Sequence, residues 1–188
     1  MFEITESAKF VTLFYGKFNR STKTLEYVNA GHNPPLHYRR RDARIEWLEA
    51  SGTPLGMFEK MDYEARQIAL EAGDILICYT DGLSEAEDAD GAQFSKEQIA
   101  LLTVQNANRG AQEIYDKLMD GVNEFRGAKE FDDDLTLVLC YQKGCKNDSI
   151  CVISNDAKKQ TNHSINGTGL SFFDKYFIQG EINRPCAN

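Results

Sequence analysis

The sequence predicts an α/β (α+β) domain, because β-prone segments fill the first half of the chain and helical segments follow them. Apolar runs bounded by turn residues recur from Val11 to Tyr79. A helix-start pattern stands at Ser95, and an apolar stripe with helical spacing lies between residues 111 and 125. The chain has 188 residues, of which 41% are hydrophobic, and this is enough for one domain with a core.

Four β-prone runs open the chain as two expected hairpins. The runs Val11–Phe18 and Thr24–Ala30 are joined by a short polar segment, which favours antiparallel pairing. The runs Leu36–Arg39 and Ile45–Leu48 form the second expected hairpin. The basic cluster Arg39–Arg41 is expected at its solvated tip, as is usual for a short charge run among turn residues.

Two further strands are expected before the helices. Turn residues at 51–56 lead into the β-prone run Tyr63–Leu70. The turn Ala72–Asp74 then starts an apolar run that ends at Asp81, and Gly82 follows at once. A continuous apolar run of this length is typical of a buried strand.

Two helices follow, each with a recognisable pattern. Ser95 and Gln98 form a capping-box pattern, so a helix is expected to begin there. Phe94 and Ile99 occupy the positions of a hydrophobic staple. A second helix is expected near 111–125, because four apolar side chains share one face. These four are expected in the core: Ile114, Leu118, Val122 and Phe125.

The composition changes after residue 142. Residues 144–188 are rich in Asn, Lys, Ser and Gly and show little periodicity. The run Ile150–Ser154 has the pattern of one short strand, and the rest is expected to be a poorly ordered tail or the start of another segment. We therefore predict a domain part at 1–142 and a tail at 143–188.

Charge and composition exclude several classes of protein. The net charge of −8 argues against a nucleic-acid-binding surface, since affinity for the phosphate backbone depends on clustered Lys and Arg. The five cysteines are odd in number and irregularly spaced, which favours a reducing, cytoplasmic setting over a disulfide framework. No apolar run approaches the ~18 residues that span a bilayer, so membrane insertion of this segment is not expected.

Two acidic motifs at strand ends suggest a metal site. Asp81 follows one apolar run, and the carboxylates Asp132–Asp134 stand immediately before another at Leu135–Leu139. Hard cations such as Mg²⁺ and Mn²⁺ prefer anionic oxygens on rigid supports. Each motif alone has a simpler reading, as a tight turn at Asp81 or as charges that protect a strand edge. Together they favour a metal centre.

Six segments resemble, in order, the successive motifs of bacterial PPM-type serine/threonine phosphatases. The resemblance is to the SpoIIE/RsbU-like branch, which includes the sporulation phosphatase and the stress-response phosphatases that act on anti-sigma-factor antagonists. The segments are Phe10–Tyr15, Tyr27–Pro35, Thr53–Gly56, Ala72–Asp74, Tyr79–Ala86 and Asp133–Leu137. This resemblance implies a PPM-type sandwich of two antiparallel β-sheets flanked by helices. The sandwich is expected to be N-terminally incomplete, because the family's upstream Gly-Asp and Asp-x-x-Gly-His-Gly motifs do not occur before Phe10.

The resemblance also implies the site residues. Asp81 and Asp133 match metal ligands of the family, and Asp134, Gly82 and His32 are expected to assist the site from beside the ligands. For His32, which stands in an Ala-Gly-His turn, a purely structural role in ordering that turn is the alternative.

The reaction that the resemblance implies is dephosphorylation of phosphoserine or phosphothreonine on a regulatory protein, expected to be an anti-sigma-factor antagonist. Two Mn²⁺ or Mg²⁺ ions would activate a water for in-line attack, so no covalent catalytic residue is expected. With the upstream ligands missing, the 188-residue chain alone is expected to be inactive. The alternative is a non-catalytic protein-interaction module that keeps the phosphatase surface.

Overall fold

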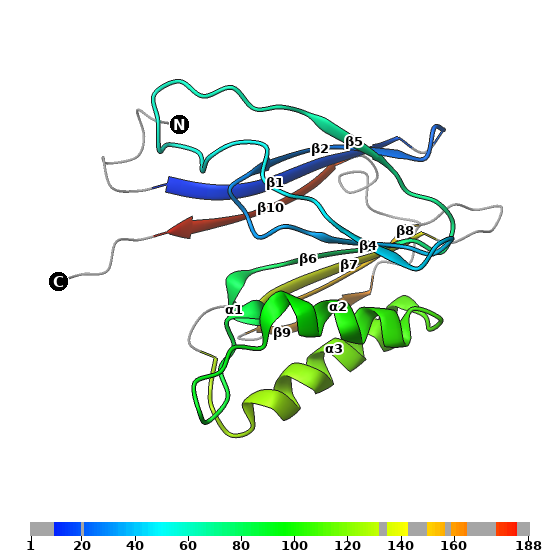
Figure 1. The fold of residues 1–188 in the computed structure, drawn as a ribbon, viewed down its shortest axis with the longest axis vertical. Coiled ribbons are helices and arrows are strands. Elements are labelled where there is room, and N and C mark those ends of the chain that lie inside the picture. Colours follow the sequence, from blue (N-terminus) through cyan, green and yellow to red (C-terminus); the bar gives the residue numbers. More distant parts are fainter. Residues whose placement is uncertain are drawn as a thin grey trace. The chain divides into compact units, whose positions relative to one another are not determined.

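The computed structural model describes residues 10–19, 21–131, 135–142, 150–156, 159–164 and 176–183, and the chain divides into two compact units. Unit 1 comprises residues 1–34, 48–70 and 170–188, and unit 2 comprises residues 35–47 and 71–169. Each unit contains one antiparallel sheet, and unit 2 also carries the helices (Figure 1). The α+β class with two antiparallel sheets, predicted from the sequence, is confirmed.

Unit 1 is built on a four-stranded sheet. Its strand order is β10-β1-β2-β5, and β1 and β2 form the first expected hairpin, with Leu13 paired to Ala30. The buried residues of this hairpin include Phe14 and Tyr27, whose rings stack with centroids 5.5 Å apart. The strand bounds are β1 Phe10–Asn19, β2 Thr24–Ala30, β5 Arg66–Ala69 and β10 Tyr176–Asn183.

Unit 2 is built on a six-stranded sheet of order β4-β3-β6-β7-β8-β9. All five residues of β6 are buried, as expected from its continuous apolar run. The second expected hairpin, β3–β4, is present, and Arg40 and Arg41 are exposed at its tip as predicted. The strand bounds are β3 Leu36–Arg39, β4 Arg44–Trp47, β6 Ile75–Tyr79, β7 Thr136–Gln142, β8 Ile150–Asp156 and β9 Lys159–Ser164.

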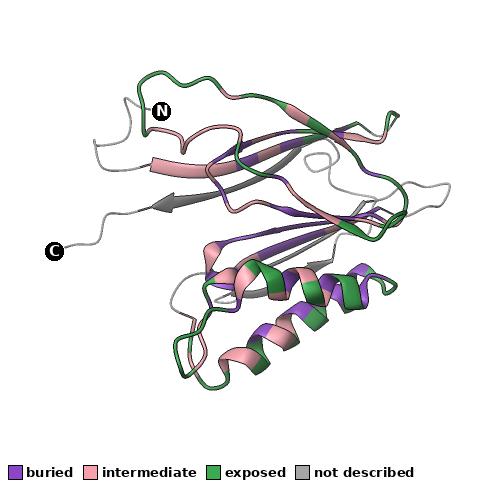
Figure 2. Cartoon of the chain, viewed as in Figure 1, coloured by how far each residue is buried: buried purple, intermediate pink, exposed green. Residues whose placement is uncertain are grey.

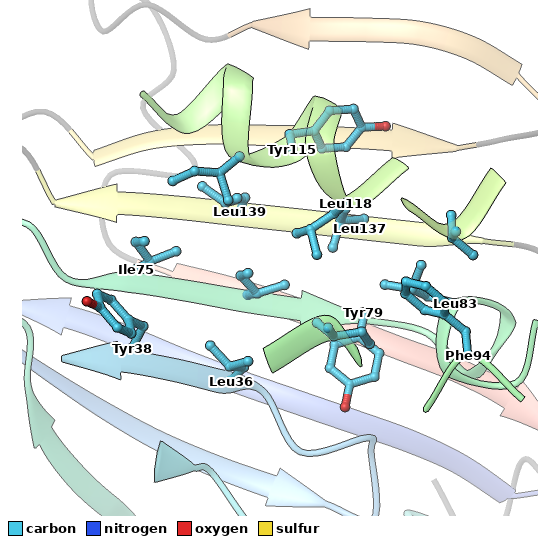
Figure 3. Packing of buried hydrophobic residues seen from close by; sticks show 14 of the residues in the cluster. Leu36, Tyr38, Ile75, Tyr79, Leu83, Phe94, Tyr115, Leu118, Leu137 and Leu139 are labelled. Atoms are coloured by element: carbon cyan, nitrogen blue, oxygen red, sulfur yellow. The ribbon is translucent and has the colours of Figure 1, made fainter. Parts of the chain in front are cut away.

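The helices cover one face of the unit 2 sheet. They are α1 Asp81–Ser84, α2 Ser95–Asn106 and α3 Ala111–Arg126. Alternate residues of β6 and β7 face them, so that Ile75, Leu137 and Leu139 join Leu118 in one buried cluster (Figure 3). Ile77 and Ile114 belong to the same cluster. Along α3 the buried residues recur with helical spacing on the side toward the sheet (Figure 2). The predicted core face of the second helix is therefore confirmed for Ile114, Leu118 and Val122, while Phe125 is only partly buried against the same cluster.

Three local features differ from the sequence-based expectation. The helix at Ser95 begins where predicted, but its N-cap is Phe94 without a side-chain cap, and Ser95 has φ of 61°. The short helix α1 was not predicted, because four residues are too few to show periodicity. In the predicted tail the structure describes β8, which overlaps the expected run Ile150–Ser154, and also β9 and β10. Strands such as these pair through the backbone, which composition alone reveals poorly. The boundary at residue 142 stays a prediction.

Within the described ranges, no helix combines the length and the apolar character needed to cross a bilayer.

Candidate metal centre

Asp81 lies at the end of the central strand of unit 2. It directly follows Thr80 and is the first residue of α1, so the chain changes from strand to helix at the carboxylate. The side chain is partly exposed, and its Oδ1 accepts a hydrogen bond of 2.8 Å from the backbone N–H of Gly82. Because β6 is buried on both faces, Asp81 is a carboxylate on a rigid support with access to solvent.

Thr80 links this strand end to the start of β7. The β6–β7 ladder pairs Tyr79 with Leu137, and its next rung joins Thr80 to Thr136. In that rung the Thr80 N–H donates to the Thr136 carbonyl at 3.0 Å. The Thr136 N–H donates to the side-chain Oγ1 of Thr80 at 2.8 Å. The side-chain oxygen therefore takes the place that a backbone carbonyl would have in a regular ladder.

The freed carbonyl of Thr80 has another partner. It accepts a hydrogen bond of 3.0 Å from the Leu83 N–H, which closes the first turn of α1. Leu83 is fully buried in the cluster beneath the helices. One residue thus completes the sheet with its side chain and begins the helix with its backbone, and Asp81 is the next residue along.

The approach to the second acidic motif is held by three contacts. The guanidinium of Arg126, at the end of α3, lies 4.4 Å from the ring centroid of Phe131 and also donates to the Lys129 carbonyl. The Lys129 ammonium forms an ion pair with Glu87, which lies in the loop after α1. These contacts connect the segment before the acidic run, at Lys129 and Phe131, to the loop after α1 at Glu87.

The predicted ligand Asp133 and its neighbour Asp134 lie outside the described residues. Of the residues that are described, no three His, Cys, Asp or Glu side chains gather closely enough to hold a metal ion. The Asp81 carboxylate is a suitable ligand for a hard divalent cation, because it is an anionic oxygen donor on a rigid strand end. A centre in this region therefore needs carboxylates beyond those described.

His32 belongs to unit 1, whereas Asp81 and Gly82 belong to unit 2. The imidazole is 3% exposed, and its Nδ1 lies 3.2 Å from the Thr12 hydroxyl. Burial lowers the pKa of His32 to about 4, so the ring is neutral at physiological pH. Its backbone N–H donates to the Asn29 side chain at 2.8 Å, which fits the structural alternative raised for this turn. The assisting role stays a prediction.

Sequence reasoning missed two residues that organise these segments. Thr80 was treated only as part of a motif, although a hydroxyl residue directly before a strand-end carboxylate is a signal that could have been used. Asn29 is fully buried and bridges two segments, since its Nδ2 donates to the Leu48 carbonyl at 3.0 Å while its Oδ1 accepts from His32. A polar residue inside a β-prone run was the only indication of it.

Comparison with known protein families gives one match over most of the chain. A sequence model of the family described as Stage II sporulation protein E (SpoIIE) matches residues 1–142. Phosphoserine phosphatase RsbU of Bacillus subtilis is 28% identical over 138 residues, which cover 73% of this chain and 41% of RsbU. Protein IcfG of Synechocystis is 29% identical over 139 residues, covering 73% of this chain and 21% of IcfG. The chain thus spans less than half of the length of these relatives.

Solved structures give the same picture for the fold. A structure of the RsbU and RsbW domains of a Mycobacterium tuberculosis protein matches with a TM-score of 0.55 and 28% identity, covering 68% of this chain and 36% of that one. The SiaA-PP2C domain of Pseudomonas aeruginosa matches with a TM-score of 0.55 over 64% of this chain and 46% of that one. At 21% identity the latter likeness concerns the fold alone.

Proposed function

Because the chain belongs to the SpoIIE family and has the fold of PP2C-like phosphatase domains, we propose that it is the C-terminal part of a metal-dependent protein phosphatase domain. The proposed reaction is hydrolysis of phosphoserine or phosphothreonine on a regulatory protein in the cytoplasm, with an anti-sigma-factor antagonist as the proposed substrate. The relative RsbU is named a phosphoserine phosphatase, which supports the reaction class.

The proposed ligands contributed by this chain are Asp81 and Asp133, assisted by Asp134. The observation that supports this most is the rung between Thr80 and Thr136. Asp81 is the residue after Thr80, and Asp133 precedes Thr136 by three residues. Three residues of fully extended chain cover at most ~11 Å, so the Cα of Asp133 can lie no farther than this from the Cα of Thr136. The register of β6 and β7 therefore limits how far apart the two acidic motifs can be.

Two Mn²⁺ or Mg²⁺ ions, when bound, would supply an activated water and neutralise charge on the phosphoryl group. The carboxylates of this chain would hold and orient the ions, and the buried strand β6 before Asp81 would limit rearrangement of that ligand. Two such ligands are few for a hard cation, because affinity rises with the number of preorganised anionic oxygens. We therefore propose that further ligands come from upstream family motifs, and that residues 1–188 alone turn over little or no substrate.

The test compares the 188-residue chain with a complete parent domain that carries the upstream Gly-Asp motif. Phosphate release from a phosphoserine peptide is measured with Mn²⁺ and with a chelator. The parent domain is expected to be active only with the metal, and the 188-residue chain no more active than its Asp81→Asn/Asp133→Asn variant. An inactive parent domain would contradict the phosphatase proposal. A clearly active 188-residue chain would contradict only the proposal that upstream ligands are needed.

A further inference from the structure

We propose that Thr80 is a positioning residue for the metal centre, acting through its hydroxyl on the direction of the Asp81 backbone. This inference rests on the proposed function, since it assumes that Asp81 is a ligand. Thr80 is 6% exposed, and its Oγ1 is the acceptor for the Thr136 N–H. The hydroxyl itself does not need to touch a metal or a substrate for this role.

Thr80 offers two acceptors at this rung, its backbone carbonyl and its hydroxyl oxygen. In a regular antiparallel rung, the Thr136 N–H would bond to the backbone carbonyl of Thr80. That carbonyl instead accepts from Leu83 and closes the turn of α1. The Thr136 N–H bonds to Oγ1 instead, so the Leu83 and Thr136 N–H groups each have their own acceptor on Thr80.

Removal of the hydroxyl takes away the acceptor of the Thr136 N–H, and two rearrangements of this rung would then affect Asp81. The Thr136 N–H can lose its partner, which weakens the end of the β6–β7 ladder. Alternatively, the Thr80 carbonyl can turn toward the Thr136 N–H, which weakens its bond to Leu83 and shifts the first residue of α1. Either change loosens the carboxylate of Asp81 relative to the start of β7. Groups that orient metal ligands from outside the coordination shell typically change metal affinity by about 10- to 100-fold when removed.

The test uses the 188-residue chain labelled with ¹⁵N and two variants of matched shape. Thr80→Val keeps the volume and removes the acceptor, whereas Thr80→Ser keeps the acceptor. Thr103→Val is the control, because Thr103 is also buried in unit 2 but its hydroxyl bonds within α2, to the Ile99 carbonyl at 2.7 Å. Hydrogen exchange of the Thr136 amide reports the rung, and broadening of the Gly82 amide by added Mn²⁺ reports metal binding beside Asp81.

Thr80→Val is expected to speed exchange of the Thr136 amide about tenfold, the equivalent of one lost hydrogen bond. It is also expected to raise the Mn²⁺ concentration that half-broadens Gly82 by about 10- to 100-fold. Thr80→Ser and Thr103→Val are expected to resemble the wild type in both measurements. If Thr80→Val does not fold, Thr80→Ala and Thr80→Ser provide the same comparison, because they differ only by the hydroxyl.

Two results would overturn the inference, and they can be told apart. Equal Mn²⁺ broadening in wild type and Thr80→Val, with a normal control, would show that Thr80 positions nothing while the metal proposal stands. No specific broadening of Gly82 at millimolar Mn²⁺, in the wild-type 188-residue chain and also in the complete parent domain, would contradict the assignment of Asp81 as a ligand, and with it the role of Thr80. Wild-type broadening that is weakened in Thr80→Val and restored in Thr80→Ser supports the inference.

Discussion

The imidazole of His37 lies against the carboxylate of Asp74, with Nε2 and Oδ2 3.2 Å apart, and both residues are almost completely buried. Asp74 also accepts hydrogen bonds of 2.8 Å from the backbone N–H groups of Arg40 and Glu71. It thereby joins the β3–β4 hairpin to the turn that precedes β6. Burial alone would raise the pKa of Asp74, but the hydrogen bonds from His37, Arg40 and Glu71 outweigh burial and leave the pKa below its usual value.

The first prediction concerns stability in acid. Because the pKa of Asp74 is lowered in the folded state, its stabilising effect is present above the unfolded pKa of about 3.9 and is lost as the pH falls through the folded value. Asp74→Asn is expected to lower the free energy of unfolding by about 1–3 kcal/mol at pH 7. The variant should also lack the decrease in stability that protonation of Asp74 causes in the wild type below about pH 4. Urea unfolding at several pH values measures both effects. Asp62→Asn, at an exposed loop position, is the control. An unchanged stability of Asp74→Asn at pH 7 would contradict the prediction.

The second prediction concerns His32, whose protonation is expected to lower stability at a higher pH than the protonation of Asp74. Burial lowers the pKa of His32 to about 4 from the ordinary value of 6.5, so protonation favours the unfolded chain. The contribution of neutral His32 to the free energy of unfolding is fully present above pH 6.5. The free energy of unfolding is expected to fall by up to roughly 3 kcal/mol as the pH drops toward 4. His32→Gln should lack this part of the pH dependence, as measured by urea midpoints at pH 7.5 and 4.5. The same slope in the variant and the wild type would show that His32 does not titrate as inferred.

The third prediction compares two glycines with left-handed backbone. Gly31 has φ of 69°, and a Cβ there would lie 2.6 Å from the Cδ of Pro54. Gly91 has φ of 81°, with no atom within 4 Å of such a Cβ. Gly91→Ala is expected to cost about 1–2 kcal/mol for the backbone conformation alone. Gly31→Ala should cost clearly more, because it adds the overlap with a rigid ring. Equal decreases in the free energy of unfolding of the two variants, measured by chemical denaturation, would mean that Pro54 moves away from the added Cβ at no cost.

The fourth prediction concerns Asp81 in the complete parent domain. Asp81→Asn keeps the shape of the side chain and removes the anionic charge that a hard cation needs, so Mn²⁺-dependent phosphatase activity should be lost with little change in melting temperature. Asp90→Asn changes an exposed aspartate of the nearby loop and should leave the activity unchanged. Near-normal turnover of Asp81→Asn at saturating Mn²⁺ would exclude Asp81 as a ligand.

The fifth prediction concerns the segment after residue 142. In the structure β8 pairs with the whole of β7, from Thr136 to Gln142, and β10 pairs with β1. Deletion of residues 143–188 removes both ladders, so the melting temperature is expected to fall by several degrees. Deletion of residues 184–188, which lie beyond β10, is the control and should have little effect. An unchanged melting temperature after the longer deletion would favour the tail that the sequence predicts.

The local patterns of the sequence determined most of the secondary structure. The apolar run before Asp81 specified a fully buried strand, and the stripe from Ile114 to Val122 specified the face that α3 buries. Both are one-dimensional signals, because the periods of 2.0 and 3.6 residues belong to the chain itself. The type of residue likewise marked Asp81 as a candidate ligand, since hard cations select carboxylates whatever the fold.

The tertiary structure alone decided which polar groups meet. Thr80 and Thr136 are 56 residues apart in sequence, and His37 and Asp74 are 37 apart. Each pair depends on the register between strands, and a shift of one residue would turn every side chain of a strand to its other face. That register is set by turns and by packing of the whole sheet, so no local pattern specifies it. For this reason the carboxylate could be recognised from the sequence, while the bond between the Thr80 hydroxyl and the Thr136 N–H could be found only in the folded chain.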